Sequence, residues 1–294
     1  MNLANRLYKG LLAFWNLLLY GNFWIALGAA AMGMVSRYFV NNTWEVDASI
    51  GFLFFSTLFT YSLHRVVGLE KTKNLELTKR YQVIRTFKKH IQVYAVLGAL
   101  GSLYFFFQLQ FQAKCLTFIL SLLALAYVLP VLNGKRLRDF HFIKVFLVAI
   151  VWAGICTGLP VVNAAQSLGQ IHILLLLEHI FFVFGITLPF DIRDQALDSH
   201  IGVKTMVNEL GVQKSKLLIY MALMTAGFLA CLVANHVASG GIYLGIRLAM
   251  YGILILVIRS LKTTDSDYIY SGLLDGSLIF GPLIFAILNN YMMA

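Results

Sequence analysis

Three aspartates stand close together where a hydrophobic segment meets a polar one: Asp191, Asp194 and Asp198. On a helix that turns about 100° per residue, positions i, i+3 and i+7 fall within about 60° of one another. The spacing therefore predicts that the three carboxylates share one helix face, with Arg193 turned away from it. Carboxylates gathered in this way repel one another unless a cation lies among them. Mg²⁺ prefers such oxygen ligands and often shares them with substrate phosphates; a solvated acidic turn is the plainer interpretation.

The composition indicates that these aspartates belong to an integral membrane protein. Hydrophobic residues make up 60% of the 294 residues and charged residues 12%, whereas a soluble domain has about 25% charged residues. Nine apolar runs, each long enough to span a bilayer, follow one another at approximately 12–34, 48–67, 91–110, 113–132, 143–163, 171–190, 217–237, 241–260 and 272–292. We therefore expect an all-α bundle of nine transmembrane helices that forms a single domain over residues 1–294, with the first apolar run retained as a helix.

Lysine and arginine are predicted to lie almost entirely on one side of this bundle. With a cytoplasmic N-terminus, only Arg37 and Lys114 fall outside and Arg247 falls within a span, while every other basic residue is cytoplasmic. Positive residues concentrate in cytoplasmic loops, so we expect a multi-pass protein of the cell inner membrane with its C-terminus outside. The net charge of +10 then reflects orientation in a lipid bilayer and not a nucleic-acid partner. The long polar segments 68–90 and 191–216 place the functional site at the cytoplasmic face.

Residues 191–206 follow the pattern D-x-x-D-x-x-x-D-x-x-x-G-x-K-T. This pattern resembles the second aspartate-rich motif of the UbiA-type intramembrane prenyltransferases. The resemblance implies nine transmembrane helices and Mg²⁺-dependent transfer of an isoprenyl chain from a polyprenyl diphosphate to a lipophilic, often aromatic, acceptor. It also implies that Asp191, Asp194 and Asp198 are catalytic metal ligands and that Lys204 contacts the diphosphate.

A second match to the family lies after the fourth apolar run. The family has a tyrosine near the end of its fourth helix, followed by basic residues that meet the diphosphate. Tyr127, Lys135 and Arg136 correspond to these positions, with a looser spacing. Lys135 and Arg136 are explained equally well as positive residues that anchor a cytoplasmic loop.

The first aspartate-rich motif of the family is missing from this chain. The family pattern N-D-x-x-D-x-x-x-D at the end of the second helix corresponds to residues 60–68, where the acidic positions hold Tyr61, His64 and Gly68. The resemblance therefore implies the loss of one metal site. His64 and Arg65 are able to donate hydrogen bonds to a diphosphate directly, although a place at the level of the lipid headgroups explains them as well.

The sequence is also compatible with two rival functions. The missing motif favours a non-catalytic relative that binds an isoprenoid or another lipid. Glu178, His179 and Arg247 lie inside predicted spans, where ionisable residues usually pair or line a cavity. A structural Glu178–Arg247 pair is the simpler expectation, and a proton or ion pathway in a transporter is the alternative. Asp275 lies just inside the last predicted span and is explained equally well as a residue at the membrane–water interface.

The predicted orientation is testable by cysteine labelling in intact cells that carry a cysteine-free background. Lys73→Cys and Gln195→Cys should react only with a membrane-permeant maleimide, because both positions are predicted to face the cytoplasm. Lys114→Cys is the control and should react with an impermeant reagent. Ready labelling of position 195 from outside would overturn both the topology and the resemblance.

Overall fold

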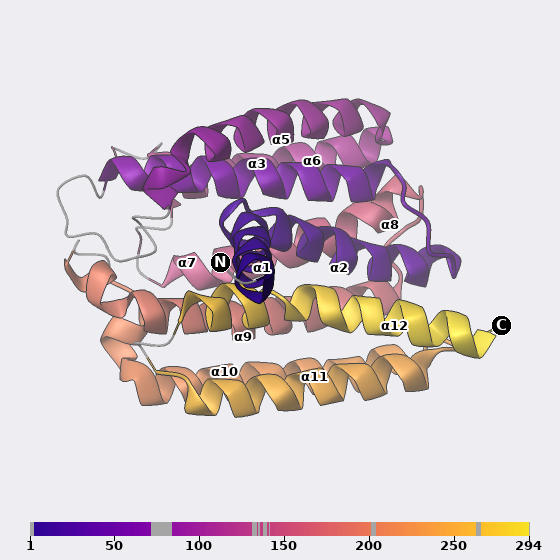
Figure 1. The fold of residues 1–294 in the computed structure, drawn as a ribbon. Coiled ribbons are helices and arrows are strands. Elements are labelled where there is room, and N and C mark those ends of the chain that lie inside the picture. The colour runs from indigo at the N-terminus through magenta and orange to yellow at the C-terminus, as the bar shows by residue number, and fades with distance from the viewer. Residues whose placement is uncertain are drawn as a thin grey trace.

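The computed structural model describes residues 3–71, 84–130, 134, 136–137, 140, 142–200, 204–262 and 266–293. Nine segments of this part of the chain are long and apolar enough to cross a membrane. They confirm the expected all-α architecture, and they run side by side in one bundle (Figure 1). Their helices are α2 (Phe23–Asn41), α3 (Ala48–Lys71), α5 (Lys88–Gln108), α6 (Phe111–Val128), α7 (Ile143–Ala153) with the π-helical turn η2 (Gly154–Gly158) and α8 (Leu159–Asn163), α9 (Gln170–His200), α10 (Met206–Ala234), α11 (Gly240–Ser260), and the π-helical η3 (Tyr268–Leu274) with α12 (Ser277–Met293).

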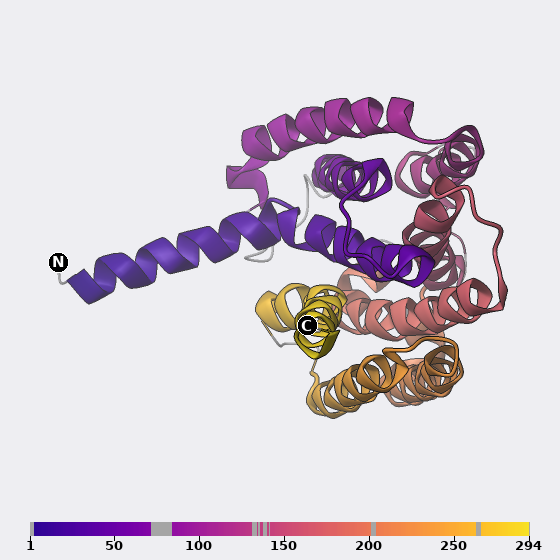
Figure 2. The same cartoon turned by 90° about the vertical axis from the view of Figure 1, so that its right-hand side faces the viewer.

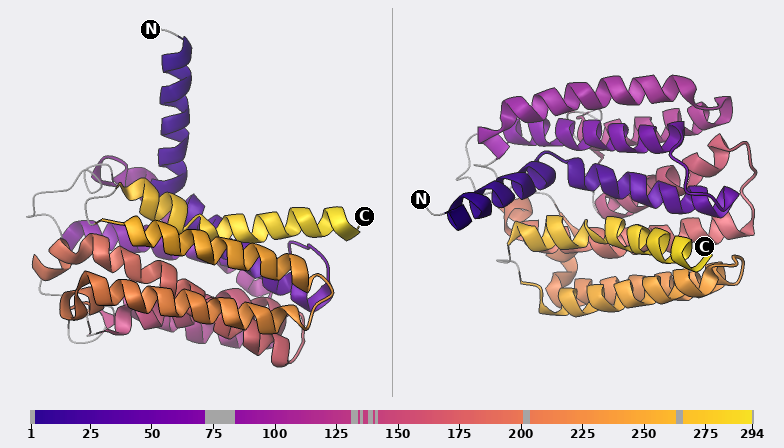
Figure 3. Two further views of the ribbon diagram at one scale, coloured as in Figure 1. Left: turned by 90° about the horizontal axis from the view of Figure 1, so that it is seen from below. Right: turned by 45° about the vertical axis from the view of Figure 1, so that its right-hand side comes forward.

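The start of the chain differs from the predicted first span. A separate helix, α1 (Leu3–Tyr20), precedes α2, and the chain turns between them at Asn22, whose φ is 66°. Asparagine tolerates this left-handed conformation better than most residues. Helix α1 projects sideways from the bundle (Figures 2 and 3). The predicted span 12–34 is therefore wrong, because its apolar run belongs to two helices of different direction.

Helix α1 is amphipathic, which explains why its apolar residues were mistaken for part of a span. Asn5, Lys9 and Asn16 fall on one side of the helix, and the other side is apolar, with Leu11 and Phe14 exposed. A helix with one polar and one apolar face suits the boundary between headgroups and acyl chains. The sequence therefore favours a position along the membrane surface for α1, in keeping with its sideways direction.

Arg65 of α3 fixes the C-terminal end of α1. Its guanidinium donates hydrogen bonds from Nη1 to the carbonyl oxygen of Tyr20 (2.7 Å) and from Nη2 to that of Leu19 (3.0 Å). The last carbonyl groups of a helix lack intrahelical donors, so these bonds satisfy groups that would otherwise be unpaired. Tyr268 adds a hydrogen bond of 2.6 Å to Asn16. The end of α1 is thus held between α3 and the last span.

Helix α9 is longer than the apolar run that predicted it. The predicted span ended at residue 190 and was followed by a polar loop, whereas α9 continues through Pro189 to His200. The acidic motif is therefore helical. Helices α3 and α5 pack as one antiparallel pair and α9 and α10 as another. The C-terminal ends of α3 and α9 and the N-terminal end of α7 meet at the same end of the bundle (left in Figure 1).

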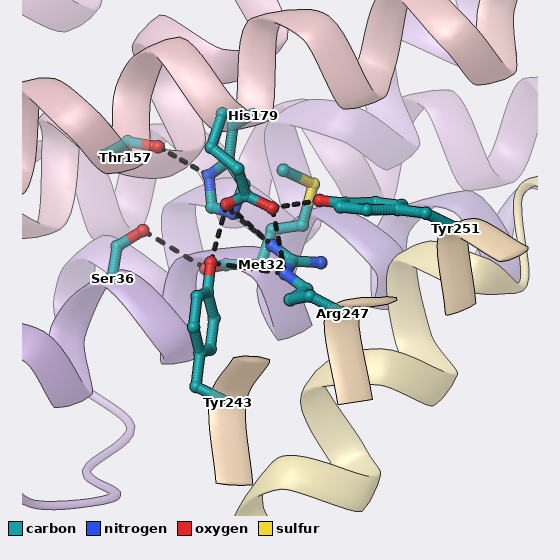
Figure 4. A network of polar contacts seen from close by, with 8 residues as sticks. Met32, Ser36, Thr157, His179, Tyr243, Arg247 and Tyr251 are labelled. Carbon is teal, nitrogen blue, oxygen red and sulfur yellow. Dashed lines mark hydrogen bonds and ion pairs between the residues drawn. The ribbon is translucent and has the colours of Figure 1, made fainter. Parts of the chain in front are cut away.

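A buried polar cluster joins α9 to α11 deeper in the bundle (Figure 4). The carboxylate of Glu178 accepts hydrogen bonds from the hydroxyl groups of Tyr243 (2.6 Å) and Tyr251, and it forms an ion pair of 3.1 Å with Nε of Arg247. All four side chains are buried. The expected Glu178–Arg247 pair is confirmed.

His179 completes this cluster on its other side. Nη2 of Arg247 lies 2.7 Å from Nε2 of His179, and Nδ1 lies 2.7 Å from the hydroxyl oxygen of Thr157 in η2. Because a guanidinium only donates, Nε2 must accept and the ring proton must lie on Nδ1, from which it is donated to Thr157. A neutral histidine and a compensated ion pair favour a structural role for the cluster over a proton pathway.

The contact between Arg65 and α1 leads to a first structural prediction. Arg65→Ala should release the end of α1, because two carbonyl groups lose their donors. Hydrogen–deuterium exchange should then rise in residues 17–22 while the bundle stays protected. Arg85→Ala removes an exposed arginine near the same end of the bundle and should change nothing. If Arg65→Ala instead left α1 protected and weakened diphosphate binding by about tenfold or more, Arg65 would be a phosphate ligand, as the sequence alone suggested.

The buried ion pair leads to a second prediction. Arg247→Met should lower the free energy of unfolding by about 3–5 kcal/mol, because it leaves Glu178 charged and buried without its partner. The double variant Glu178→Gln/Arg247→Met should recover most of this loss. Denaturant titrations in detergent, followed by circular dichroism, would measure both. A double variant as unstable as the single one would show that packing, and not charge compensation, sets the role of this pair.

Candidate functional site

A polar cavity of about 160 Å³ opens where the ends of α3, α7 and α9 meet. Its walls include residues of both aspartate-motif regions, and Asp198, the last aspartate of the second motif, is not among the lining residues. Both carboxylates and cations line it: Asp191, Asp194 and Asp275 are the acidic lining residues, and Arg65, Lys144 and Arg193 the basic ones. The cavity is therefore a strongly charged space at the edge of an apolar bundle, where charges interact more strongly than in water.

Lys144, in the first turn of α7, lies between two carboxylates of the acidic motif. Its ammonium group forms an ion pair with Asp191 and lies 3.5 Å from Oδ2 of Asp198. Both aspartates are buried. The prediction that these two carboxylates share a helix face is consistent with their convergence on one cation.

Asp194 is held differently from the other two motif residues. Arg193 binds it through two nitrogens, with Nε 2.8 Å from Oδ1 and Nη2 2.9 Å from Oδ2, and Nη1 reaches Asp267 at 3.1 Å. The guanidinium also lies over the rings of Phe190 and Tyr270. The expectation that Arg193 turns away from the carboxylates is therefore wrong, because its side chain folds back onto its neighbour in the chain.

The residues at the missing first motif do line this cavity. Tyr61, His64 and Arg65 of α3 face it together with Tyr127 of α6. The rings of His64 and Tyr127 lie 6.3 Å apart, centroid to centroid. The structure thus brings the predicted positions from two distant segments to one place, although the guanidinium of Arg65 is also committed to the end of α1. Gly68, the last position of the missing motif, is not among the described lining residues.

Two apolar cavities continue from the charged one into the bundle. The first, of about 120 Å³, lies between α3, α6 and α7 and shares Tyr61, His64, Tyr127 and Val148 with the charged cavity. The second, of about 90 Å³, follows it and shares Ala124 and Trp152 with the first. The three cavities therefore lie next to one another, and the lining changes from charged to apolar at the two tyrosines.

The basic residues predicted to contact a diphosphate are not all at the cavity. Lys204 is exposed at the start of α10, beside Thr205, whose side chain caps that helix by accepting a hydrogen bond from Asn208. Arg136 is buried but is not among the lining residues. Lys135 lies outside the described residues. The described part of the chain thus places cations from α3, α7 and α9 at the cavity instead.

Sequence reasoning missed two members of the site. Lys144 was counted only as one of the positive residues of a cytoplasmic loop, and Asp275 only as a residue at the edge of a span. A signal for Lys144 was its place one residue inside a predicted span, where an unpaired ammonium is unfavourable. Nothing in the sequence linked it to Asp191, because the two positions are joined only by the packing of α7 against α9.

The predicted three-carboxylate magnesium site is not assembled in the described part of the chain. No group of three or more histidine, cysteine, aspartate and glutamate side chains there converges closely enough to hold a metal ion. Mg²⁺ requires its oxygen ligands at about 2.1 Å, whereas Asp191 and Asp198 are drawn toward an ammonium and Asp194 toward a guanidinium. The residues as arranged do not fit the ion that the motif implies.

Solved structures share this fold over nearly the whole chain. A UbiA homologue from Archaeoglobus fulgidus bound to GPP and Mg²⁺ is 11% identical, covers 92% of this chain and 99% of its own, and superposes with a TM-score of 0.68. The apo UbiA homologue from Aeropyrum pernix K1 is 13% identical, covers 93% and 98%, and has a TM-score of 0.67. At these identities the likeness shows the fold alone.

The sequence comparison agrees with the structural one. No curated protein matches the sequence at a significant level. The model of the UbiA prenyltransferase family, however, matches residues 84–271, which include the acidic motif, Tyr127 and Lys144. This match extends over more than half of the chain and, with the nine-helix bundle, shows that the protein belongs to the UbiA prenyltransferase family.

Proposed function

We propose that this protein transfers an isoprenyl chain from a polyprenyl diphosphate to a lipophilic aromatic acceptor that enters from the bilayer. The observation that supports this function best is the succession of one charged cavity and two apolar cavities that share lining residues. A diphosphate with a hydrocarbon tail has the same change of polarity along its length. Homologues of the same fold bind GPP and DMAPP together with Mg²⁺.

The proposed transfer starts with ionisation of the allylic diphosphate. The leaving diphosphate gains negative charge, which Lys144 and Arg193 are placed to meet at the charged cavity. The allylic cation left behind would lie at the boundary between the cavities, beside the rings of Tyr61 and Tyr127. Aromatic faces attract cations, and the apolar lining beyond them keeps water away from the cation. In the proposed site, Asp191, Asp194 and Asp198 orient these basic residues.

The two rival functions differ in the support that they retain. The missing first motif and the internally paired second motif favour a non-catalytic protein that binds an isoprenoid diphosphate in the same cavities. The transporter has less support, because Glu178, His179 and Arg247 form a compensated cluster with a neutral histidine. We propose the cell inner membrane as the location, with the charged cavity on the cytoplasmic side, from the distribution of basic residues.

Transfer by the purified protein in nanodiscs would test the proposed function. Geranyl, farnesyl and geranylgeranyl diphosphates would be offered with a panel of aromatic and lipid acceptors, in Mg²⁺ and in EDTA. We expect a prenylated product that is lost in Asp191→Asn, since this change leaves Lys144 without its nearest carboxylate. Binding of a prenyl diphosphate without transfer to any acceptor would support the non-catalytic rival.

The length of the donor gives a matched control in the same experiment. Ala124 lines both apolar cavities, so Ala124→Phe should fill the space beyond the first one. Use of the longest donor should then fall about tenfold or more relative to the shortest, because the displaced isoprene units lose their buried contacts. Leu122→Phe places the same ring on the exposed side of α6 and should not change the preference. If Ala124→Phe lowered the use of all donors equally, the hydrocarbon chain would not lie in these cavities.

A further inference from the structure

Lys144 is not placed like a residue that anchors a helix at the membrane surface. Anchoring lysines extend their ammonium groups into water, whereas the side chain of Lys144 is only 12% exposed and points at a carboxylate that is 1% exposed. A cation in the first turn of a helix is also disfavoured by the helix dipole. The contact with the acidic motif therefore explains the position of this side chain better than orientation in the bilayer does.

Asp191 depends on this lysine. Apart from the ion pair with Lys144, neither oxygen of its carboxylate has a hydrogen-bond partner among the described residues. A buried charge without a partner costs several kcal/mol, so a carboxylate in this position requires a cation. Within the described residues, the side chain that meets this requirement is that of Lys144.

The ammonium group also suits the spacing of the two carboxylates that it joins. Asp191 and Asp198 are seven residues apart on α9, which places their backbones about 10 Å apart along the helix axis. A Mg²⁺ ion bound to both would hold two oxygens within about 4 Å of each other, given bond lengths of about 2.1 Å. The ammonium of Lys144 bridges a wider gap, since its contact with Asp198 is 3.5 Å long.

We propose that Lys144 is the resident cation of the acidic motif, so that the free protein holds an ammonium group, and not a divalent metal ion, between Asp191 and Asp198. A divalent ion reaches these two carboxylates only by displacing Lys144. The second aspartate-rich motif of this chain is then an internal ion-pair site. Its divalent affinity is set by a residue of α7 that lies outside the motif.

Direct metal binding tests this inference without any measurement of transfer. Mn²⁺, which prefers carboxylate ligands, would be titrated into the purified full-length protein in detergent, and free Mn²⁺ would be followed by electron paramagnetic resonance. Wild type should bind it weakly. Lys144→Gln should bind it about tenfold more tightly or better, because two buried carboxylates lose their ammonium and recruit the ion.

Three further variants separate this effect from a general change in charge or in folding. Lys144→Arg keeps the cation and should stay weak. Lys214→Gln removes an exposed lysine and should match wild type. Lys144→Gln/Asp191→Asn removes both members of the pair and should lose the added affinity, while circular dichroism and thermal unfolding report whether each variant is folded.

Two results would overturn the inference. One is tight Mn²⁺ binding by wild type that Asp191→Asn abolishes, since the motif would then hold the metal with Lys144 present. The other is a folded Lys144→Gln that binds Mn²⁺ no better than wild type. The inference concerns a motif to which the proposed function gives a role, and its failure is distinguishable from failure of that function, because the titration contains no prenyl diphosphate.

Discussion

The buried carboxylate of Asp191 is the constraint on which the arrangement of the charged cavity depends. A carboxylate that is 1% exposed is tolerated in an apolar bundle only beside a cation. The cation comes from α7, so α7 and α9 must pack closely at this end of the bundle. Helix α9 in turn extends past the apolar run to present Asp194 and Asp198. The same pairing therefore fixes the position of two helices and the electrostatic character of the cavity between them.

Helix α9 contains two clusters of charge that solve the problem of burial in different ways. Glu178 is surrounded by two tyrosines and an arginine, and all four side chains are buried. Asp191, 13 residues further along the same helix, borders an open cavity. A closed cluster rigidifies the interface between α9 and α11. That rigidity gives the acidic motif a firm support about 20 Å away along the helix axis.

Most of the fold could be predicted from the sequence, because the patterns that indicate it lie within short segments of the chain. Apolar runs and basic loops predicted nine spans, and the spacing of three aspartates predicted a shared helix face. The first span was misplaced because a window of hydropathy does not register the direction of the chain, which turns at Asn22. The pairing of Glu178 with Arg247 was predictable, since two opposite charges inside spans have few alternatives.

The site was only partly accessible, because its decisive contacts are distant in sequence. Lys144 and Asp275 contribute to the cavity through packing that no motif encodes. The predicted direction of Arg193 was wrong because helix geometry determines only the direction of the Cα–Cβ bond. The rest of a long side chain can bend back toward an adjacent residue, here Asp194. The partners of Arg65 were also hidden, since they are backbone carbonyl groups at the end of a helix that hydropathy did not separate from α2.

The ion pair between Lys144 and Asp191 restricts the order in which these two positions can mutate. Loss of Asp191 first would leave the ammonium with Asp198 as its longer contact, and loss of Lys144 first would leave two buried carboxylates without this cation. Only in the second intermediate can dissolved Mg²⁺ bind in place of the lost positive charge. Under the proposed role of Lys144, a lineage could move between lysine-filled and metal-filled forms of this motif by a single substitution at position 144. The three aspartates of the motif would be the same before and after that step, so the motif alone does not report which cation a given descendant uses.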